Sequence, residues 1–554
     1  MSNRFDNSRV EGFLRADGIR TVNAAGEEVL LRGWGAGNWT NPEGFMLGVG
    51  TGYMHRGMGE GLRLHERMTT ARSFDAVIRD ICGSAYAEGF WSRWHRNHLD
   101  EADIRAMAEW GYNSVRLPIT AWVLLPEEPE PRFSEEGFAM LDRVLDWCEK
   151  YRVYAILDMH GAPGGQSGLS CDDGLDNVPR MFMEPESRKR GLMLWEELAR
   201  RYADRWIIGG YDLLNEPIAI GRWRHLLGEL ERFYDDAIAR IRRHDRNHIV
   251  FLEGTLFSTN MDIFHRAYDG ECGNWGVSIH LYNVSPEARE LYKFIEVQHR
   301  LNVPVWIGEG RLKDPGMAVF YEIAAKHHMG YNLWVWKSVV NDEDSGATTY
   351  VLPEGFDAIL KYATEGGPRP TYAEGQRLFD AMLENLRYGN CSVNEGAHLY
   401  CQRRQGIALP AAGYDPEGFS GGWELGNAMG YRAEDGTHLV MKDGAKVPDN
   451  FAIGGPPPVR DPLGSLLLQL DEGAFASYTV RAVKSECAVT LCARSLGGAR
   501  LLAEEDGRSV ELEIPAGTDF TEYPLPTLMP TDARTVRLTS VRGSVQLESI
   551  SFSR

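Results

Sequence analysis

Two short strings of the sequence each place a glutamate where it could take part in chemistry. Asn215-Glu216-Pro217 ends an apolar run over 211–214, and Gly308-Glu309-Gly310 ends another over 303–307. Cleavage of a glycosidic bond needs two carboxyl groups: one protonates the leaving oxygen, and the other attacks the sugar or activates water. Because the two glutamates lie far apart in the sequence, only the fold can bring them together.

The two carboxyl groups would need opposite protonation states. The acid must keep its proton, and its pKa rises when a second carboxylate lies close by and when substrate expels water. The other group must stay ionised, and Arg116, in the β-like run 113–119, could hold it charged. An arginine in that position could equally belong to a structural ion pair. Asn215 is suited to bind a sugar 2-hydroxyl.

Other polar and aromatic residues end further β-like runs. His160 ends one run, and His280 and Tyr282 end another, where strand alternation puts them on one face. Trp334 and Trp336 end the last run, and an indole offers a flat apolar surface that suits a pyranose ring. Each of these residues alone could be structural, but their convergence at predicted strand ends favours a substrate site.

The elements that must position these residues alternate between short β-like runs and amphipathic helical segments from residue 25 to about 335. The runs are 28–34, 113–119, 153–160, 210–215, 248–253, 275–282, 303–309 and 331–336. Intervening helices are expected over 138–152, 187–202, 223–244 and 316–328, and a last barrel helix over 376–387. This alternation predicts parallel strands in a closed (β/α)8 barrel, with chemistry at the carboxyl ends of the strands. An open doubly wound sheet is the alternative, but no Gly-rich phosphate fingerprint follows an early strand.

The interval between the first two predicted strands is much longer than the others. This insertion, at about 38–98, has a Gly- and Met-rich loop followed by a helical stretch with apolar residues from Phe74 to Cys82. On the first βα-loop it would lie over the barrel mouth. It could wall one end of the cleft, form a subunit contact or be an ordered surface excursion.

The pattern changes after residue 388, where short alternating runs replace the helical period. The runs 477–480, 488–491, 535–538 and 545–550 predict a C-terminal antiparallel β-sandwich, with a turn at 454–458. We therefore expect a catalytic domain over 1–388 and an accessory domain over 389–554. The accessory domain loosely resembles carbohydrate-binding modules. Tyr414 and Trp423 could stack on sugars, or the domain could be purely structural.

Composition limits the classes of partner. The net charge of −20 argues against nucleic acid and anionic membranes, and no window approaches the apolar length of a membrane span. The N-terminus lacks the apolar stretch of a secretory signal, so we expect a cytoplasmic protein, or a secreted one if a signal has been removed. The eight cysteines form no C-x-x-C pair, which disfavours zinc, and a Cys391–Cys401 disulfide is one option.

The ordered set of residues resembles glycoside hydrolase family 5, over about residues 25 to 340. The set is Arg116, His160, Asn215-Glu216-Pro217, His280, Tyr282, Glu309 and Trp336. The resemblance implies a (β/α)8 barrel and a double displacement that retains the anomeric configuration, without a metal or cofactor. It implies Glu216 as acid/base and Glu309 as nucleophile. By the same resemblance, the subsite of the reacting sugar would be lined by Arg116, His160, Asn215, His280, Tyr282 and Trp336.

The loop from His160 to Gly168 is more particular. It is similar to the His-Gly-Ala-Pro-Gly-Ser-Gln segment of the exo-β-1,3-glucanase and β-glucosidase branch, and the Trp336-Lys337 pair fits that branch too. The likeness implies a gluco-configured substrate and exo action. Gly310 departs from the branch, which has a bulky residue after the nucleophile. The insertion and the sandwich also depart from it, and these differences bear on the identity of the substrate.

The sequence thus predicts a retaining β-glycosidase acting on β-linked glucosides or related oligosaccharides and glycoconjugates. One alternative is a transglycosidase that uses the same glycosyl-enzyme intermediate. The other is a sugar-binding barrel without activity. The linkage, the choice between glucose and mannose, and the oligomeric state stay open.

Overall fold

The structure is a computed structural model. It describes residues 9–49, 68–126, 130–282, 284, 287–312, 315–340, 346–421, 432–442, 466–483, 485–505 and 507–553. The chain divides into two compact units. The first holds residues 1–281, 294–310 and 328–394, and the second holds 282–293, 311–327 and 395–554. The domain boundary at residue 388 stays a prediction.

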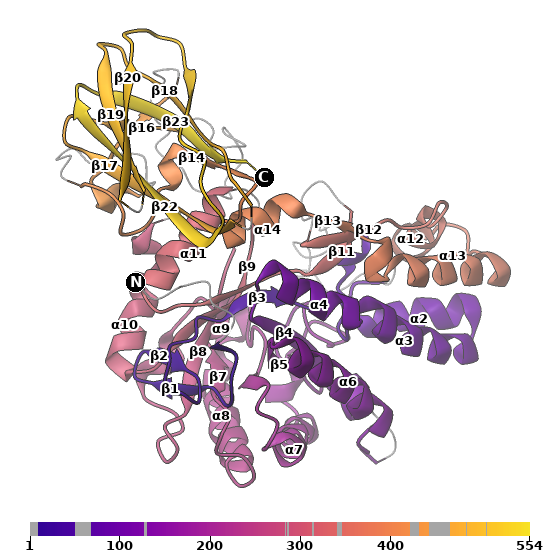
Figure 1. The fold of residues 1–554 in the computed structure, drawn as a ribbon. Helices are drawn as coiled ribbons and strands as arrows, with labels where there is room; N and C mark the ends of the chain where they lie inside the picture. Colours follow the sequence, from indigo (N-terminus) through magenta and orange to yellow (C-terminus); the bar gives the residue numbers. More distant parts are fainter. Residues whose placement is uncertain are drawn as a thin grey trace. The chain divides into compact units, whose positions relative to one another are not determined.

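Eight parallel strands close into a barrel in the order in which they follow one another along the chain, so that the last strand pairs with the first. The strands are β3 (Arg32–Gly35), β4 (Ser114–Thr120), β5 (Tyr154–Gly161), β6 (Ile208–Asp212), β7 (Val250–Glu253), β8 (Trp275–Leu281), β9 (Val305–Gly310) and β10 (Tyr331–Leu333). Every residue of these strands is buried, as expected where helices cover the outside of a parallel sheet. The predicted (β/α)8 barrel is confirmed (Figure 1).

Helices lie between most successive strands along the chain, and two more follow the last strand. They are α4 (Glu101–Trp110), α6 (Glu135–Tyr151), α7 (Pro185–Tyr202), α8 (Leu227–Ile241), α10 (Tyr292–Leu301), α11 (Pro315–Lys326), α12 (Asp357–Glu365) and α13 (Tyr372–Asn385). Their starts follow capping rules. The Ser134 hydroxyl, for example, accepts the Gly137 backbone N–H at the start of α6. The helices predicted within the barrel are present, with ends shifted by a few residues.

The insertion after the first strand builds two helices, α2 (Ala71–Cys82) and α3 (Ser84–His98). They share an apolar core with α12 and α13, in which Phe74, Phe90 and Phe379 meet edge to face. The helical stretch predicted from Phe74 to Cys82 is therefore present. Residues 50–67 of the predicted Gly- and Met-rich loop lie outside the described residues.

The second unit contains two antiparallel sheets whose buried side chains form one apolar cluster. One sheet runs β15-β16-β23-β18-β21 with β14 beside β23, and the other runs β17-β22-β19-β20. Their strands are β14 (Ile407–Pro410), β15 (His438–Met441), β16 (Leu466–Leu470), β17 (Phe475–Val483), β18 (Val489–Arg494), β19 (Ala499–Glu505), β20 (Arg508–Ile514), β21 (Thr521–Pro524), β22 (Thr531–Arg542) and β23 (Val545–Phe552). The predicted antiparallel sandwich is confirmed (Figure 1). The predicted turn at 454–458 lies outside the described residues.

Two further expectations from composition can be compared with the structure. None of the eight cysteines, all of them in described parts of the chain, forms a disulfide, so the Cys391–Cys401 pairing is wrong. Across the ranges that the structure describes, no helix combines the length and the apolar character needed to cross a membrane.

Candidate active site

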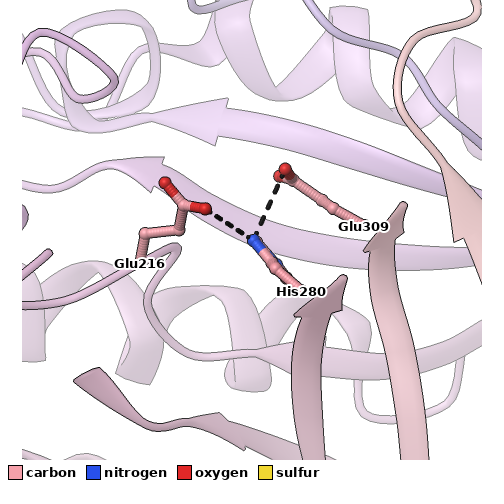
Figure 2. Close-up of side chains that lie close together, drawn as sticks. All are labelled: Glu216, His280 and Glu309. Carbon is pink, nitrogen blue, oxygen red and sulfur yellow. Dashed lines mark hydrogen bonds and ion pairs between the residues drawn. The ribbon is translucent and has the colours of Figure 1, made fainter. Parts of the chain in front are cut away.

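The barrel brings the two predicted glutamates together. Glu309 lies in β9, and Glu216 lies four residues after the end of β6. Each offers a carboxylate oxygen that, together with a ring nitrogen of His280 from β8, falls within a cluster 4.8 Å across. His280 lies between the two carboxylates, with its Nδ1 2.8 Å from Glu216 and 3.4 Å from Glu309 (Figure 2).

Arg116, from β4, organises the floor of the site. Its guanidinium donates to Glu309 at 2.6 Å and to the Asn215 side-chain oxygen at 3.0 Å. It also contacts three carboxylates that the sequence analysis did not single out. These are Asp158 at 3.1 Å, Asp212 at 3.0 Å and Glu253 at 2.9 Å. Because the cation is fully buried, these contacts are not screened by water.

The three acidic residues had a signal in the sequence. Asp158 and Asp212 are each a single charge inside an otherwise apolar β-like run, and Glu253 ends the run 248–253. Asp158 also lies two positions before His160, on the same strand face. A charge buried in a strand must be paired or held by hydrogen bonds. The prediction did not pair these acidic residues with Arg116 and therefore overlooked its partners.

Glu253 supports the backbone of Glu216. One oxygen of its carboxylate accepts the Glu216 N–H at 2.7 Å, and the other accepts from Arg116. Burial would raise the pKa of Glu253, but the positive charges of His280 and Arg116 lower it to about 2. Glu253 is thus ionised, as suits a carboxylate that accepts from the Glu216 N–H and from Arg116.

Glu216 has the environment of a carboxylic acid that keeps its proton. Burial raises its pKa above the ordinary value, and the nearby charges of Glu309 and Glu253 raise it further, against the lowering effect of His280. The pKa of His280 lies well above its ordinary value, because the surrounding carboxylates outweigh the effect of burial.

His160 forms the other side of the site. Its Nδ1 lies 2.7 Å from Asp158, and its Nε2 lies 3.6 Å from Glu43, which comes from the loop after the first barrel strand. Burial would lower the pKa of His160, but the Asp158 and Glu43 carboxylates raise it to about 10. Glu43 was not predicted as a site residue. Only its position in the long first loop could have pointed to it.

The loop after β5 is tied to both flanking strands. The Gln166 side chain donates to the carbonyl oxygens of His160 and Asn215 and accepts the Ala162 N–H. The buried Asp172 carboxylate accepts four hydrogen bonds from the same loop. The donors are the backbone N–H groups of Gln166, Ser167 and Gly174 and the Ser167 hydroxyl. These hydrogen bonds hold the ends of β5 and of the Asn215 segment at a fixed spacing.

Comparisons with known proteins agree with this geometry. Residues 77–339 match the family model described as cellulase (glycosyl hydrolase family 5). These residues hold seven of the eight barrel strands, β4 to β10. A β-xylosidase of Phanerodontia chrysosporium is 34% identical over 52% of this chain and 56% of that protein. A probable glucan 1,3-β-glucosidase A of Emericella nidulans is 26% identical over 37% of this chain and 53% of that protein.

A third relative and a solved structure extend the comparison. Endoglucanase C of Acetivibrio thermocellus is 29% identical over 30% of this chain and 46% of that protein. The chain thus matches about half the length of each of these curated relatives. The crystal structure of an endogalactoceramidase is 15% identical, with a TM-score of 0.44, over 97% of this chain and 100% of that chain.

Trp336, predicted to line the sugar subsite, packs against α4 instead. Trp336 is buried, donates its indole N–H to Asp103 of α4 at 2.8 Å and stacks on Tyr388. Trp334 instead stacks on His160, with ring centroids 5.0 Å apart and planes 1° apart, and is partly exposed. The strand β10 ends at residue 333, so the alternation used to place Trp336 does not reach it. Of the two tryptophans predicted at this strand end, Trp334 is therefore the one that lies beside His160.

Two glycines make room for Trp334. A Cβ at Gly35 would lie 2.4 Å from the Trp334 ring, and one at Gly37 would lie 2.4 Å from the Val335 side chain. Tyr282 directly follows β8, as predicted, and its side chain is partly exposed.

In the second unit, Tyr414 is buried under Arg432, whose guanidinium lies 3.4 Å from its ring centroid, so it is not a sugar-stacking surface residue. Trp423 lies outside the described residues.

The cluster of Glu216, His280 and Glu309 is also the one group, among the residues that the structure describes, whose geometry could hold a metal ion. A metal ligand must be a neutral imidazole. The raised pKa of His280 instead favours the imidazolium, which pairs with the carboxylates directly. The arrangement therefore fits proton transfer and charge stabilisation better than metal binding.

Replacing Glu43 with glutamine is expected to make stability less dependent on pH. Burial raises the pKa of Glu43 from 4.5 to about 7, so the folded protein holds this proton more tightly than the unfolded chain. Its contribution to stability is fully present below pH 4.5 and is lost as the pH rises through about 7. The unfolding free energy of the variant minus that of the native protein should therefore rise by about 2–3 kcal/mol from about pH 4 to about pH 8.

Denaturant unfolding of both proteins at the two pH values measures this difference. Glu354→Gln, at an exposed position, is the matched control and should show no such gain. A stability difference between Glu43→Gln and the native protein that is the same at both pH values would contradict the assignment.

Proposed function

We propose that this protein is a retaining β-glycosidase in which Glu309 is the nucleophile and Glu216 the acid/base. The observation that carries the proposal is the pair of carboxylate oxygens within 4.8 Å of each other. Retaining enzymes hold their two carboxyl groups about 5–5.5 Å apart, whereas inverting enzymes leave about 6.5–9.5 Å for a water molecule.

The surroundings support different roles for the two groups. Arg116 donates to Glu309 at 2.6 Å, so a cation lies directly beside the group that would attack the anomeric carbon. Glu216 has a raised pKa and can give its proton to the leaving oxygen. Once the leaving group has departed, ionised Glu216 can take a proton from water, which then hydrolyses the glycosyl-enzyme intermediate.

We further propose exo action on a gluco- or xylo-configured terminal sugar. Glu43 is a buried carboxylate beside His160, so it offers acceptors for neighbouring hydroxyls of a single sugar ring. Trp334, partly exposed and stacked on His160, offers the flat face against which such a ring could pack. Two relatives, a β-xylosidase and a probable glucan 1,3-β-glucosidase A, have names that agree with this substrate class.

A panel of aryl β-glycosides tests the activity, followed by defined β-linked oligosaccharides and glycolipids with product mapping. Release of single sugar units from one end supports exo action, and release of internal fragments contradicts it. Transfer of the sugar to an added acceptor in preference to water would identify a transglycosidase. No turnover on any substrate of the panel would overturn the proposed activity and favour a sugar-binding barrel.

A further inference from the structure

Two loops beside the candidate site contain an unusual number of left-handed residues. Leu256, Phe257 and Ser258, directly after β7, have φ of 53°, 56° and 55°. Glu216 and Ile218, after β6, have φ of 43° and 52°. None of the five is glycine, and left-handed backbone is unfavourable for such side chains. Backbone held in this way clusters at functional sites, where surrounding contacts enforce it.

Hydrogen bonds join the two loops to each other. The Leu256 N–H donates to the Ile218 carbonyl oxygen at 3.2 Å. The Ser258 hydroxyl donates to Oε2 of Glu253, the same oxygen that accepts the Glu216 N–H at 2.7 Å. The left-handed turn thus delivers a hydroxyl to the carboxylate that holds the backbone of the proposed acid/base.

The Glu253 carboxylate connects this turn to the rest of the site. Its Oε1 accepts from Arg116 at 2.9 Å and lies 3.2 Å from Nε2 of His280. Its Oε2 accepts from Ser258 and Glu216. The side chain is fully buried, so no water replaces a donor that is removed.

We propose that Ser258 is a positioning residue that acts through Glu253 to hold Glu216 in the orientation for proton donation. The inference rests on the proposed function of Glu216. Without the hydroxyl, the one donor to Oε2 of Glu253 that remains among the described residues is the Glu216 N–H, and the carboxylate can turn toward Arg116 and His280. The hydrogen bond from the Glu216 N–H to Glu253, which helps to hold the left-handed backbone of Glu216, is then weakened.

The proposed nucleophile, Glu309, should be affected far less by loss of the Ser258 hydroxyl. Glu309 accepts directly from Arg116, and Arg116 is also held by Asp158, Asp212 and Asn215. Loss of Ser258 should therefore weaken proton donation more than nucleophilic attack. Proton donation matters for a poor leaving group and hardly at all for one that departs as a stable anion.

The test is the dependence of kcat/KM on the leaving group. We expect Ser258→Ala to lower kcat/KM about 10-fold or more for a phenyl β-glycoside, and no more than about twofold for the dinitrophenyl β-glycoside of the same sugar. Ser258→Gly should show the same split, because it lacks the hydroxyl but relieves the left-handed backbone. Glu216→Gln, which cannot donate a proton in the same way, gives the full size of the effect.

Thr259→Ala is the matched control. The Thr259 hydroxyl donates to the Leu256 carbonyl oxygen at 2.7 Å, in the same turn. This variant should keep the leaving-group dependence of the native protein. If it reproduces the split, the shape of the turn and not the Ser258 hydroxyl is responsible, and the proposal is overturned.

Two other results would also overturn it. Equal losses on both substrates in Ser258→Ala and Ser258→Gly would show a general structural defect, and full activity on both would show that the hydroxyl has no role. Failure of the proposed function would look different, because the native protein would then turn over neither substrate.

Discussion

Replacing Glu309 with glutamine is expected to lower kcat/KM toward a dinitrophenyl β-glucoside by about 10⁴-fold or more. Glutamine has nearly the shape of glutamate but is no nucleophile, and it cannot carry the charge that Arg116 stabilises at 2.6 Å. The activated leaving group needs little acid catalysis, so the loss reports on attack at the anomeric carbon and not on proton donation.

Glu354→Gln, made at an exposed position, controls for the chemistry of the substitution itself. Circular dichroism and thermal unfolding should show that the Glu309 variant is folded. A Glu309→Gln protein that keeps more than about a tenth of the native kcat/KM would exclude this residue as the nucleophile.

Replacing Arg116 with methionine is expected to reduce stability and activity together. Removing this cation leaves Asp158, Asp212, Glu253 and Glu309 buried without their shared partner. Removing one partner of a buried ion pair costs about 3–5 kcal/mol, because the remaining charges are uncompensated. Glu309, the proposed nucleophile, would also lose its direct hydrogen-bond donor.

Urea unfolding and kcat/KM on the same preparations measure both effects. Arg116→Lys keeps the charge but loses the planar fork, so it should fold more stably than the methionine variant and still lose most activity. Arg105→Met is the control, since Arg105 forms an exposed pair with Glu109 at 3.8 Å and should change stability by no more than about 1 kcal/mol. An Arg116→Met protein as stable and active as the native one would contradict the described role.

The sequence was sufficient for the barrel because alternation of strand and helix is a long-range pattern. Glu216 and Glu309 could be placed for the same reason: counting strands puts them at the carboxyl ends of the fourth and seventh strands of one closed sheet. The sandwich was predicted on the same principle, from period-two runs separated by turns.

Details that depend on side-chain partners could not be read in this way. Glu253 and Ser258 act through hydrogen bonds to a backbone N–H and to each other, and neither stands in a recognisable motif. Trp336 was assigned to the subsite by resemblance, but it is buried and bonded to Asp103, because β10 ends at residue 333. Glu43 comes from a loop whose path no local pattern predicts.

The most direct test of the two-glutamate account is the anomeric configuration of the first product. Proton NMR, recorded in the first minutes of hydrolysis of an aryl β-glycoside that the native protein turns over, distinguishes the β- from the α-anomer before mutarotation mixes them. The carboxylate pair within 4.8 Å predicts that the β-anomer forms first. If the α-anomer forms first, hydrolysis proceeds by inversion, and Glu309 is not a nucleophile.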